Sequence, residues 1–463
     1  MPCAKAVRVA QGRKTKTVKK FEALGLAPQI LRVLEAQNIT TPTPIQTRAI
    51  PEALAGRDVM GLAQTGTGKT AAFGLPIVQK LLTSGTSPAP KTARALILAP
   101  TRELARQISD ALFAFTRQTH LSVGLVVGGQ SMSMQAKRLG RGMDILVATP
   151  GRLVDHLERK TVRLNETGFL VLDEADQMLD MGFIHALRQI APLMPRRRQT
   201  MLFSATMPKQ MEEISQTYLN DPVRIEVSPV GQVADRITQS VHFLAQAEKL
   251  AFLKECLAAH QGEMSLVFCR TKYGCERMMK NLVASGFEAD SIHGNKSQGQ
   301  RDRALKGFKT GKTTILVATD VAARGIDIPG VAYVYNYEIP HVPENYVHRI
   351  GRTARAGRKG RAVAFCAPAE VSDFRAIEKI MKQSVPVASG TPGPEPEGKP
   401  KRGRPGRRKS GGGGQGGGQG AGQGAGQGAG RAGGGQGGAA AKAQKPRPGR
   451  PRRRNKPKRS AQA

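Results

Sequence analysis

The sequence has few of the features that would place a protein in a membrane or outside the cell. No apolar run in its 463 residues approaches the roughly 20 residues that a membrane-spanning helix needs. The first residues also lack the apolar stretch of a signal peptide. Five cysteines are an odd number, and no two are spaced like a zinc site or a redox motif. We therefore expect reduced, mostly buried thiols in a cytoplasmic protein that has no membrane attachment.

Acidic residues are missing from both ends of the chain, although the formal net charge is +36. Residues 1–20 contain seven Lys and Arg, residues 399–463 contain eighteen, and neither segment contains an acid. A basic balance of this size predicts a polyanionic partner such as nucleic acid. Because the C-terminal segment also lacks aromatic side chains, its attraction should be directed at phosphates and indifferent to base sequence.

The composition divides the chain into a globular body and two polar extensions. After about Gln383 the composition turns to Pro and then to Gly and Gln, and the Gly- and Gln-rich stretch contains no apolar side chain large enough for its burial to offset the entropy of ordering. We expect residues 1–20 and 384–463 to be disordered. The body should contain one domain over residues 21–228, a linker over residues 229–240 and a second domain over residues 241–383.

Short apolar runs alternate with helical patterns in both domains, which predicts an α/β fold. Continuous apolar strands separated by helices are typical of parallel sheets that are covered on both faces. The expected strands are RDVMGLA from Arg57, ARALILAP from Ala93, DILVATP from Asp144, FLVLDEAD from Phe169, TMLFSAT from Thr200, SLVFCRTK from Ser265, TTILVATD from Thr313 and VAYVYNYEIP from Val331.

A phosphate-binding loop is predicted where the first of these strands meets a helix. The stretch AQTGTGKT has Ala where the general pattern has Gly, and its residues are Ala63, Gln64, Thr65, Gly66, Thr67, Gly68, Lys69 and Thr70. Backbone N–H groups of such a loop surround phosphates. Lys69 should reach the β- and γ-phosphates, and Thr70 should offer its hydroxyl to Mg²⁺. The sequence therefore predicts a site for a magnesium–nucleotide complex.

Two carboxylates end another predicted strand, at Asp173 and Glu174. Taken alone, they could simply be the acidic start of a helix. Because ligands of α/β proteins bind at the carboxyl edge of the sheet, the same carboxylates could lie beside the phosphate loop. Asp173 would then hold Mg²⁺, usually through water, and Glu174 would activate the attacking water.

A dense run of arginines, HRIGRTARAGRKGR from His348, lies in the second domain. Such a run could be a solvated basic turn or a patch that binds RNA phosphates. Alternatively, one or two of its arginines could complete the hydrolytic site when the domains close.

With these motifs in view, the chain resembles the DEAD-box RNA helicases of superfamily 2, and within them the bacterial RhlE-like group, from Phe21 to about Lys382. The resemblance implies two tandem RecA-like P-loop domains that clamp RNA and ATP between them, with Mg²⁺ as cofactor. TPTPIQ ends at Gln46, which would read the adenine edge while Phe21 stacks on the base. The family's arginine fingers would be Arg352 and Arg355.

The same resemblance implies roles for residues that no simple pattern singles out. RNA-backbone contacts fall to Arg102, Gly129, Thr149, Arg152, Arg301 and Thr319. Ribose contacts fall to Gly325 and Asp327. Coupling between hydrolysis and strand separation falls to Ser204, Thr206 and His348.

The function that the resemblance implies is ATP-dependent, local unwinding of short RNA duplexes through closure of the two domains. Backbone contacts carry no sequence information, so RNA binding should be unspecific in sequence. We expect a monomer, with ribosomal and RNA-degradation complexes as candidate partners. One alternative is an RNA-annealing or ribonucleoprotein-remodelling protein that acts mainly through its tail. Another is a different P-loop enzyme, such as a DNA translocase or a nucleotide kinase.

Overall fold

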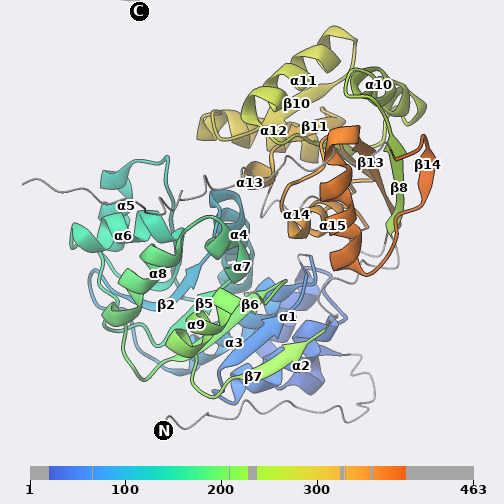
Figure 1. Cartoon of the computed structure of the whole chain (residues 1–463). Helices are drawn as coiled ribbons and strands as arrows, with labels where there is room; N and C mark the ends of the chain where they lie inside the picture. The colour runs from blue at the N-terminus through green and yellow to red at the C-terminus, as the bar shows by residue number, and fades with distance from the viewer. Residues whose placement is uncertain are drawn as a thin grey trace, which may run out of the picture. The chain divides into compact units, whose positions relative to one another are not determined.

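The computed structural model describes residues 20–64, 66–207, 209–227, 237–323, 328, 330–354 and 358–392. Four of the predicted site residues lie outside the described residues, namely Thr65, Gly325, Asp327 and Arg355. Residues 1–19 and 393–463, which include most of the two basic extensions, also lie outside them. The described chain contains two seven-stranded sheets (Figure 1).

The first sheet has the strand order β3-β4-β2-β5-β6-β1-β7, and its paired strands are parallel. Its strands are β1 (Val59–Leu62), β2 (Ala93–Leu98), β3 (Val123–Val126), β4 (Met143–Ala148), β5 (Phe169–Leu172), β6 (Gln199–Ser204) and β7 (Val223–Glu226). Because these strands are parallel and β5, β6 and β1 are neighbours in this order, their carboxyl ends lie at the same edge of the sheet.

The second sheet repeats this plan, with the order β10-β11-β9-β12-β13-β8-β14 and parallel pairing throughout. Its strands are β8 (Ile237–Phe243), β9 (Ser265–Phe268), β10 (Ala289–Ile292), β11 (Ile315–Ala318), β12 (Tyr333–Asn336), β13 (Gly360–Cys366) and β14 (Val387–Ser389). β8 begins inside the segment expected to be a linker. β14 lies beyond residue 383, the expected end of the second domain, but it belongs to this sheet because it pairs with β8.

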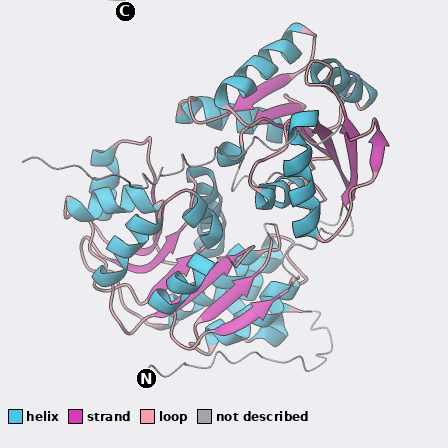
Figure 2. Cartoon of the chain, in the orientation of Figure 1, coloured by secondary structure: helices cyan, strands magenta, loops and turns pink. Residues whose placement is uncertain are grey.

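Helices connect the strands of both sheets and flank them (Figure 2). In the first domain they are α1 (Pro28–Ala36), α2 (Pro44–Leu54), α3 (Lys69–Thr83), α4 (Arg102–Thr116), α5 (Met132–Leu139), α6 (Pro150–Glu158), α7 (Ala175–Asp180), α8 (Ile184–Ile190) and α9 (Lys209–Tyr218). In the second they are α10 (Lys249–Ala259), α11 (Lys272–Ala284), α12 (Gln298–Lys309), α13 (Asp320–Ala323), α14 (Pro343–Ile350) and α15 (Val371–Met381). Short 3₁₀ helices are η1 (Phe21–Leu24), η2 (Ala191–Leu193) and η3 (Pro368–Glu370).

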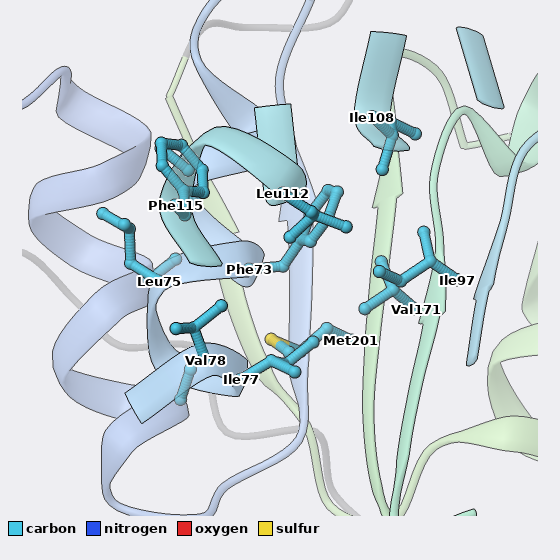
Figure 3. Packing of buried hydrophobic residues seen from close by; sticks show 14 of the residues in the cluster. Phe73, Leu75, Ile77, Val78, Ile97, Ile108, Leu112, Phe115, Val171 and Met201 are labelled. Atoms are coloured by element: carbon cyan, nitrogen blue, oxygen red, sulfur yellow. The ribbon is translucent and has the colours of Figure 1, made fainter. Parts of the chain in front are cut away.

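The central strands of the first sheet are apolar on both faces, as parallel strands between helices must be. Alternate residues face opposite sides, so Ile97 and Val171 join the layer formed with α3 and α4. Their neighbours Leu96 and Leu170 join the opposite layer. Figure 3 shows Phe73 from α3 and Leu112 from α4 packed in the first layer. The first layer fixes α3, and with it the loop that precedes it, against the sheet.

The predicted α/β class with two parallel sheets is confirmed. Each of the eight apolar runs identified in the sequence contains a strand, and the strands lie next to one another in parallel. Within the part of the chain that the structure describes, there is no helix whose length and hydropathy would suit a membrane span.

Candidate functional site

The loop between β1 and α3 has a backbone suited to an anion. Gly66 and Gly68 have φ values of 82° and 84°, in the left-handed region that glycine adopts without strain. A Cβ atom on Gly68 would lie 2.4 Å from Nε2 of Gln46, so a side chain there would also collide. Because α3 begins at Lys69, its first N–H groups and the positive end of its dipole lie at this loop.

Lys69 joins the carboxyl ends of two strands. Its side chain is 5% exposed, and its Nζ donates a hydrogen bond to the carbonyl oxygen of Ala63 at 3.1 Å. The same Nζ lies 3.9 Å from Oδ1 of Asp173, which follows β5. An ion pair of this length is at its outer limit, and an ammonium group has three donors. The arrangement leaves Lys69 able to bind a further anion at the loop.

Asp173 and Glu174 are buried at the end of β5, each about 2% exposed. Burial raises the pKa of Asp173 to about 6, Lys69 lowers it, and the neighbouring Glu174 raises it. Glu174 has φ 52°, a left-handed conformation that is uncommon for a residue with a side chain. The backbone turn therefore places two carboxylates side by side where the strand ends.

This donor set fits magnesium held together with a nucleotide. Mg²⁺ is usually bound by one or two carboxylates, with phosphates and waters completing its shell. Asp173 supplies a buried carboxylate whose raised pKa a nearby cation would lower, and Thr70 supplies a hydroxyl from the first turn of α3. Among the residues that the structure describes, no cluster of three or more His, Cys, Asp or Glu side chains could hold a metal alone.

Asp176 connects the carboxylate turn to the loop after β6, a link that sequence reasoning missed. Its Oδ2 accepts hydrogen bonds from the backbone N–H of Ala205 at 3.1 Å and of Thr206 at 2.9 Å. The Thr206 hydroxyl donates to the same oxygen at 2.9 Å, and Ser204 donates to the Thr206 carbonyl at 2.6 Å. The structure thus links two predicted coupling residues to the segment that follows Asp173 and Glu174: Thr206 contacts Asp176 directly, and Ser204 is linked to it through Thr206.

Gln46 links α2 to the phosphate loop. Its Nε2 donates to the carbonyl of Gly68 at 2.9 Å, while its Oε1 accepts from the N–H of Thr43 at 2.9 Å. A glutamine amide has two donor hydrogens and two acceptor sites, so one of each remains for a base edge. Phe21, which was predicted to stack on the base, is 4% exposed and belongs to the core of the first domain. Only a small part of its ring surface is therefore open.

A second group of predicted residues lines a groove of about 430 Å³, which includes Arg102, Gly129, Thr149, Arg152 and Arg301. Arg102 begins α4 and lies over the glycine pair that follows β3. A Cβ atom on Gly129 would come within 2.5 Å of its Nη1. The glycines are therefore required for the close approach of this guanidinium. Arg301 on α12 forms an ion pair with Glu103 at 3.0 Å.

Arg152 is held by a layer of side chains behind the groove. Its Nη1 donates to the carbonyl of Gln130 at 3.0 Å and to Oε1 of Gln135 at 3.4 Å. Gln135 is buried, and its Nε2 donates to the carbonyl of Val127 at 2.9 Å. His156, also buried, meets the Gln135 oxygen through Nε2 at 3.0 Å, and burial lowers its pKa. No motif in the sequence indicated Gln135 or His156.

In the second domain a buried arginine joins two of the predicted segments. Arg349 forms a bidentate ion pair with Asp320, at 2.5 and 2.7 Å, and donates to the carbonyl of Glu338 at 2.7 Å. Arg352, one turn further, is 4% exposed and donates through Nε to the carbonyl of His348 at 3.2 Å. Thr319 lies just before α13 and is buried. Arg349 therefore fixes the α14 segment that carries His348 and Arg352 against the end of β11.

Two family models match the chain, one in each domain. The model described as DEAD/DEAH box helicase matches residues 43–214. The model described as helicase conserved C-terminal domain matches residues 248–357.

Similar proteins are found in bacteria and in yeast. The ATP-dependent RNA helicase CshA of Listeria monocytogenes is 43% identical over 364 residues, which cover 79% of this chain and 69% of that protein. The DEAD-box ATP-dependent RNA helicase CshA of Bacillus subtilis is 41% identical over 365 residues, covering 79% and 73%. The structure of S. cerevisiae Dbp5 bound to RNA and ADP BeF3 is similar with a TM-score of 0.72 and 31% identity, covering 80% of this chain and 96% of that one.

Proposed function

This chain belongs to the DEAD-box family of ATP-dependent RNA helicases, and on that premise we propose how its own residues divide the work. The protein hydrolyses ATP and uses the reaction to unwind RNA locally. The narrower assignment to the RhlE-like group stays a prediction, since the relatives described above are CshA proteins. The alternative of an annealing protein that works mainly through its tail is not favoured.

ATP binds at the loop between β1 and α3. Lys69 and the backbone N–H groups from Gly66 to Thr70 bind its phosphates, and Gln46 offers its remaining donor and acceptor to the adenine. Asp173 and Thr70 would hold Mg²⁺, which supplies charge neutralisation at the phosphates. Glu174 orients the attacking water and takes its proton. The observation that carries this assignment is the long, buried Lys69–Asp173 ion pair beside the glycine loop.

Hydrolysis is completed by the second domain. Arg352 and Arg355 bring positive charge to the transition state when the two domains close on RNA and ATP. Asp176 passes a change at the carboxylate turn to Thr206 and Ser204, through the hydrogen bonds that hold the loop after β6. Hydrolysis and the state of the bound RNA are therefore linked.

RNA is bound through its backbone. Arg102, Gly129, Thr149 and Arg152 meet phosphates on the first domain, and Arg301 and Thr319 on the second. The solved yeast relative is described as bound to RNA, which supports this assignment. The basic tail adds phosphate-directed attraction. We place the protein in the cytoplasm as a monomer, with ribosomal or RNA-degradation complexes as candidate assemblies.

The substitution Glu174→Gln tests the catalytic assignment. RNA-stimulated ATP turnover should fall by at least about 10²-fold, since a positioned general base contributes 10² to 10⁴. Binding of ATP should be retained, and the RNA complex formed with ATP should persist. Steady-state ATPase assays and nucleotide binding measure both quantities, with Glu158→Gln, an exposed carboxylate on α6, as the control. Normal turnover in the Glu174→Gln protein would remove Glu174 from this role.

A further inference from the structure

The edge strand of the first sheet borders a groove that shares no lining residue with the groove around Arg102 and Arg152, although Gln135, which holds Arg152, also lines it. The groove has a volume of about 440 Å³ and is lined by β3, the end of α5 and one residue each from α4 and β4. We call it the β3-edge groove, and the residues that matter here are Val123, Leu125, Lys137, Arg138, Arg141 and Met143. Val123, Leu125 and Met143 are only partly buried, so apolar surface is open along the strand.

The backbone of β3 offers hydrogen-bonding groups to this groove. The N–H of Ile145 donates to the carbonyl of Ser122, and the N–H of Thr149 donates to that of Val126. Alternation along a parallel strand then directs the N–H and C=O groups of Val123 and Leu125 away from β4. Backbone hydrogen bonds found for the described residues include none from these outward groups to another segment. An extended chain laid along β3 would satisfy them.

The charged side chains of the groove are all basic. Lys137 and Arg138 lie in the last turn of α5 and Arg141 follows it, and the three are exposed. Within the described parts of the chain, the ion pairs that we find include none of them. By contrast, Arg102 and Arg152 at the RNA groove are hydrogen-bonded within the protein. Among the described residues, the cations at the β3-edge groove therefore have no ion-pair partner, and acidic side chains of another molecule can pair with them.

We propose that the β3-edge groove binds an extended acidic segment of a partner protein, which adds a strand to β3. The partner's backbone pairs with Val123 and Leu125, and its alternate apolar side chains lie against the partly buried apolar residues. Its Asp and Glu residues pair with Lys137, Arg138 and Arg141. Phe113 is 62% exposed and lies on α4 one turn beyond Ser109, which lines the groove.

Two other occupants fit the groove less well. A second copy of this chain that paired β3 with β3 would bring the same basic side chains together, and like charges at an interface are unfavourable. RNA phosphates could accept hydrogen bonds from the N–H groups and the cations. However, phosphates would leave the outward carbonyls of Val123 and Leu125 without donors, and they would gain nothing from the apolar surface.

Selection of short random linear peptides, displayed on phage, against the full chain tests the proposal. Enriched peptides should combine Asp and Glu with alternating apolar residues. The labelled synthetic peptides should bind about tenfold or more weakly, by fluorescence anisotropy, to a protein with Arg138→Glu and Arg141→Glu. Methylation of alternate backbone nitrogens of the peptide should weaken binding similarly, since a strand needs those donors. The RNA concentration for half-maximal ATPase should stay the same in the charge-reversed protein.

The matched control is Arg196→Glu with Arg197→Glu, an exposed basic pair elsewhere on the first domain. This protein should bind the peptides as the parent does. Three results would overturn the proposal: no enriched peptide, peptides without acidic residues, or equal binding to the Arg138 and Arg141 variant. If that variant instead needed much more RNA for half-maximal ATPase, the groove would belong to the RNA path. A concentration-dependent dimer of the parent that is lost in the variant would indicate a second copy as occupant.

Discussion

The two sheets carry a buried lysine–carboxylate pair at the same edge, yet the two pairs differ in how completely their atoms are used. β5 and β6 in the first sheet hold the places that β12 and β13 hold in the second. Lys69 donates one hydrogen bond to a carbonyl and lies 3.9 Å from Asp173. Lys249 donates to the carbonyls of Tyr337 and Phe365, at 3.1 and 2.8 Å, and forms an ion pair with Glu370.

The carboxylates of the two pairs, Glu370 and Asp173, also differ in how many of their atoms have partners. Glu370 also accepts a hydrogen bond from the backbone N–H of Ala367 at 3.0 Å and forms a second ion pair, with Arg270, at 3.1 Å. Asp173 has the like charge of Glu174 beside it, and burial raises its pKa. In the second sheet, the groups of the lysine–carboxylate pair are saturated with partners inside the protein. At the equivalent place in the first sheet, the pair is not saturated, so it can still bind phosphate and metal. Saturation, rather than burial, separates the pair in the second sheet from the pair that we propose as catalytic.

The largest effect expected of this comparison is on stability, when Lys249 is removed. Lys249→Met leaves the Glu370 carboxylate buried, with Arg270 as its remaining ion-pair partner and the N–H groups of Ile339 and Ala367 as hydrogen-bond donors. Breaking a buried ion pair costs 3 to 5 kcal/mol, and the remaining arginine favours the lower end, about 3 kcal/mol. Urea unfolding should show this loss, while RNA-stimulated turnover of the folded protein stays near that of the parent.

The control for this substitution is Lys254→Met, on the same helix but only half-buried. Its effect on the free energy of unfolding should be small. Lost nucleotide binding in the Lys249→Met protein without a loss of stability would mean that the second pair is functional and that the distinction fails.

A smaller effect is expected in the pH dependence of stability at Asp173. The pKa of its carboxyl is raised from 3.8 to about 6 in the folded chain, so the unfolded chain releases this proton first as the pH rises. The nucleotide-free protein should therefore lose stability from this group between about pH 4 and pH 6, after which the loss is constant. Asparagine carries no such proton. The stability gained by Asp173→Asn over the parent should grow across this window, as urea unfolding at several pH values would show.

Asp110→Asn, an exposed change on α4, provides the reference and should give no such trend. If the stability difference between the Asp173→Asn protein and the parent stayed constant with pH, Asp173 would ionise as an ordinary carboxyl. The like charge and burial at the site would then have been compensated by groups other than Lys69.

The smallest effect is expected from substitution of Gln135, behind the groove that Arg102 and Arg152 line. Gln135→Met removes the hydrogen bonds that hold Arg152 and His156 while keeping most of the side-chain volume. A lost hydrogen bond is worth about 1 kcal/mol, so the RNA concentration for half-maximal ATPase should rise about fivefold, with the maximal rate unchanged. Met134→Ala, at an exposed position on the same helix, is the control. A fall in the maximal rate alone would argue against a role in RNA binding.

The sequence alone predicted eight of the strands and the position of Asp173 and Glu174 at the end of one of them. Runs such as ARALILAP are apolar throughout because β2 is covered on both faces, and this pattern is hard to mistake. The edge strands β3, β7, β10 and β14 were not identified in advance, and neither were β8 and β13. β3 is only partly covered and β14 has exposed residues, so their short segments resemble loops. β7 lies in a polar stretch just before the expected linker, and β8 begins inside that linker.

The site was predictable where a motif fixes the backbone and not where distant side chains meet. Gly66, Gly68 and Lys69 indicate their loop in the sequence, because this backbone has positive φ angles at both glycines just before a helix. Asp176 contacts Thr206 across about thirty residues of chain, and nothing local to either residue signals the pairing. Gln135 and His156 likewise belong to helices whose contact depends on the packing of α5 and α6 against one sheet edge.

The measurement that tests the comparison most directly is the rise in melting temperature when AMP-PNP and Mg²⁺ are added to Lys69→Met and Lys249→Met proteins. A ligand at about 100 times its Kd stabilises the folded state by about 2.7 kcal/mol. The account predicts that the Lys249→Met protein melts at a lower temperature than the parent without ligand but keeps the full nucleotide-induced rise. It predicts that the Lys69→Met protein melts near the parent temperature without ligand and loses the rise. A full rise in the Lys69→Met protein, or its loss in the Lys249→Met protein, would contradict the account.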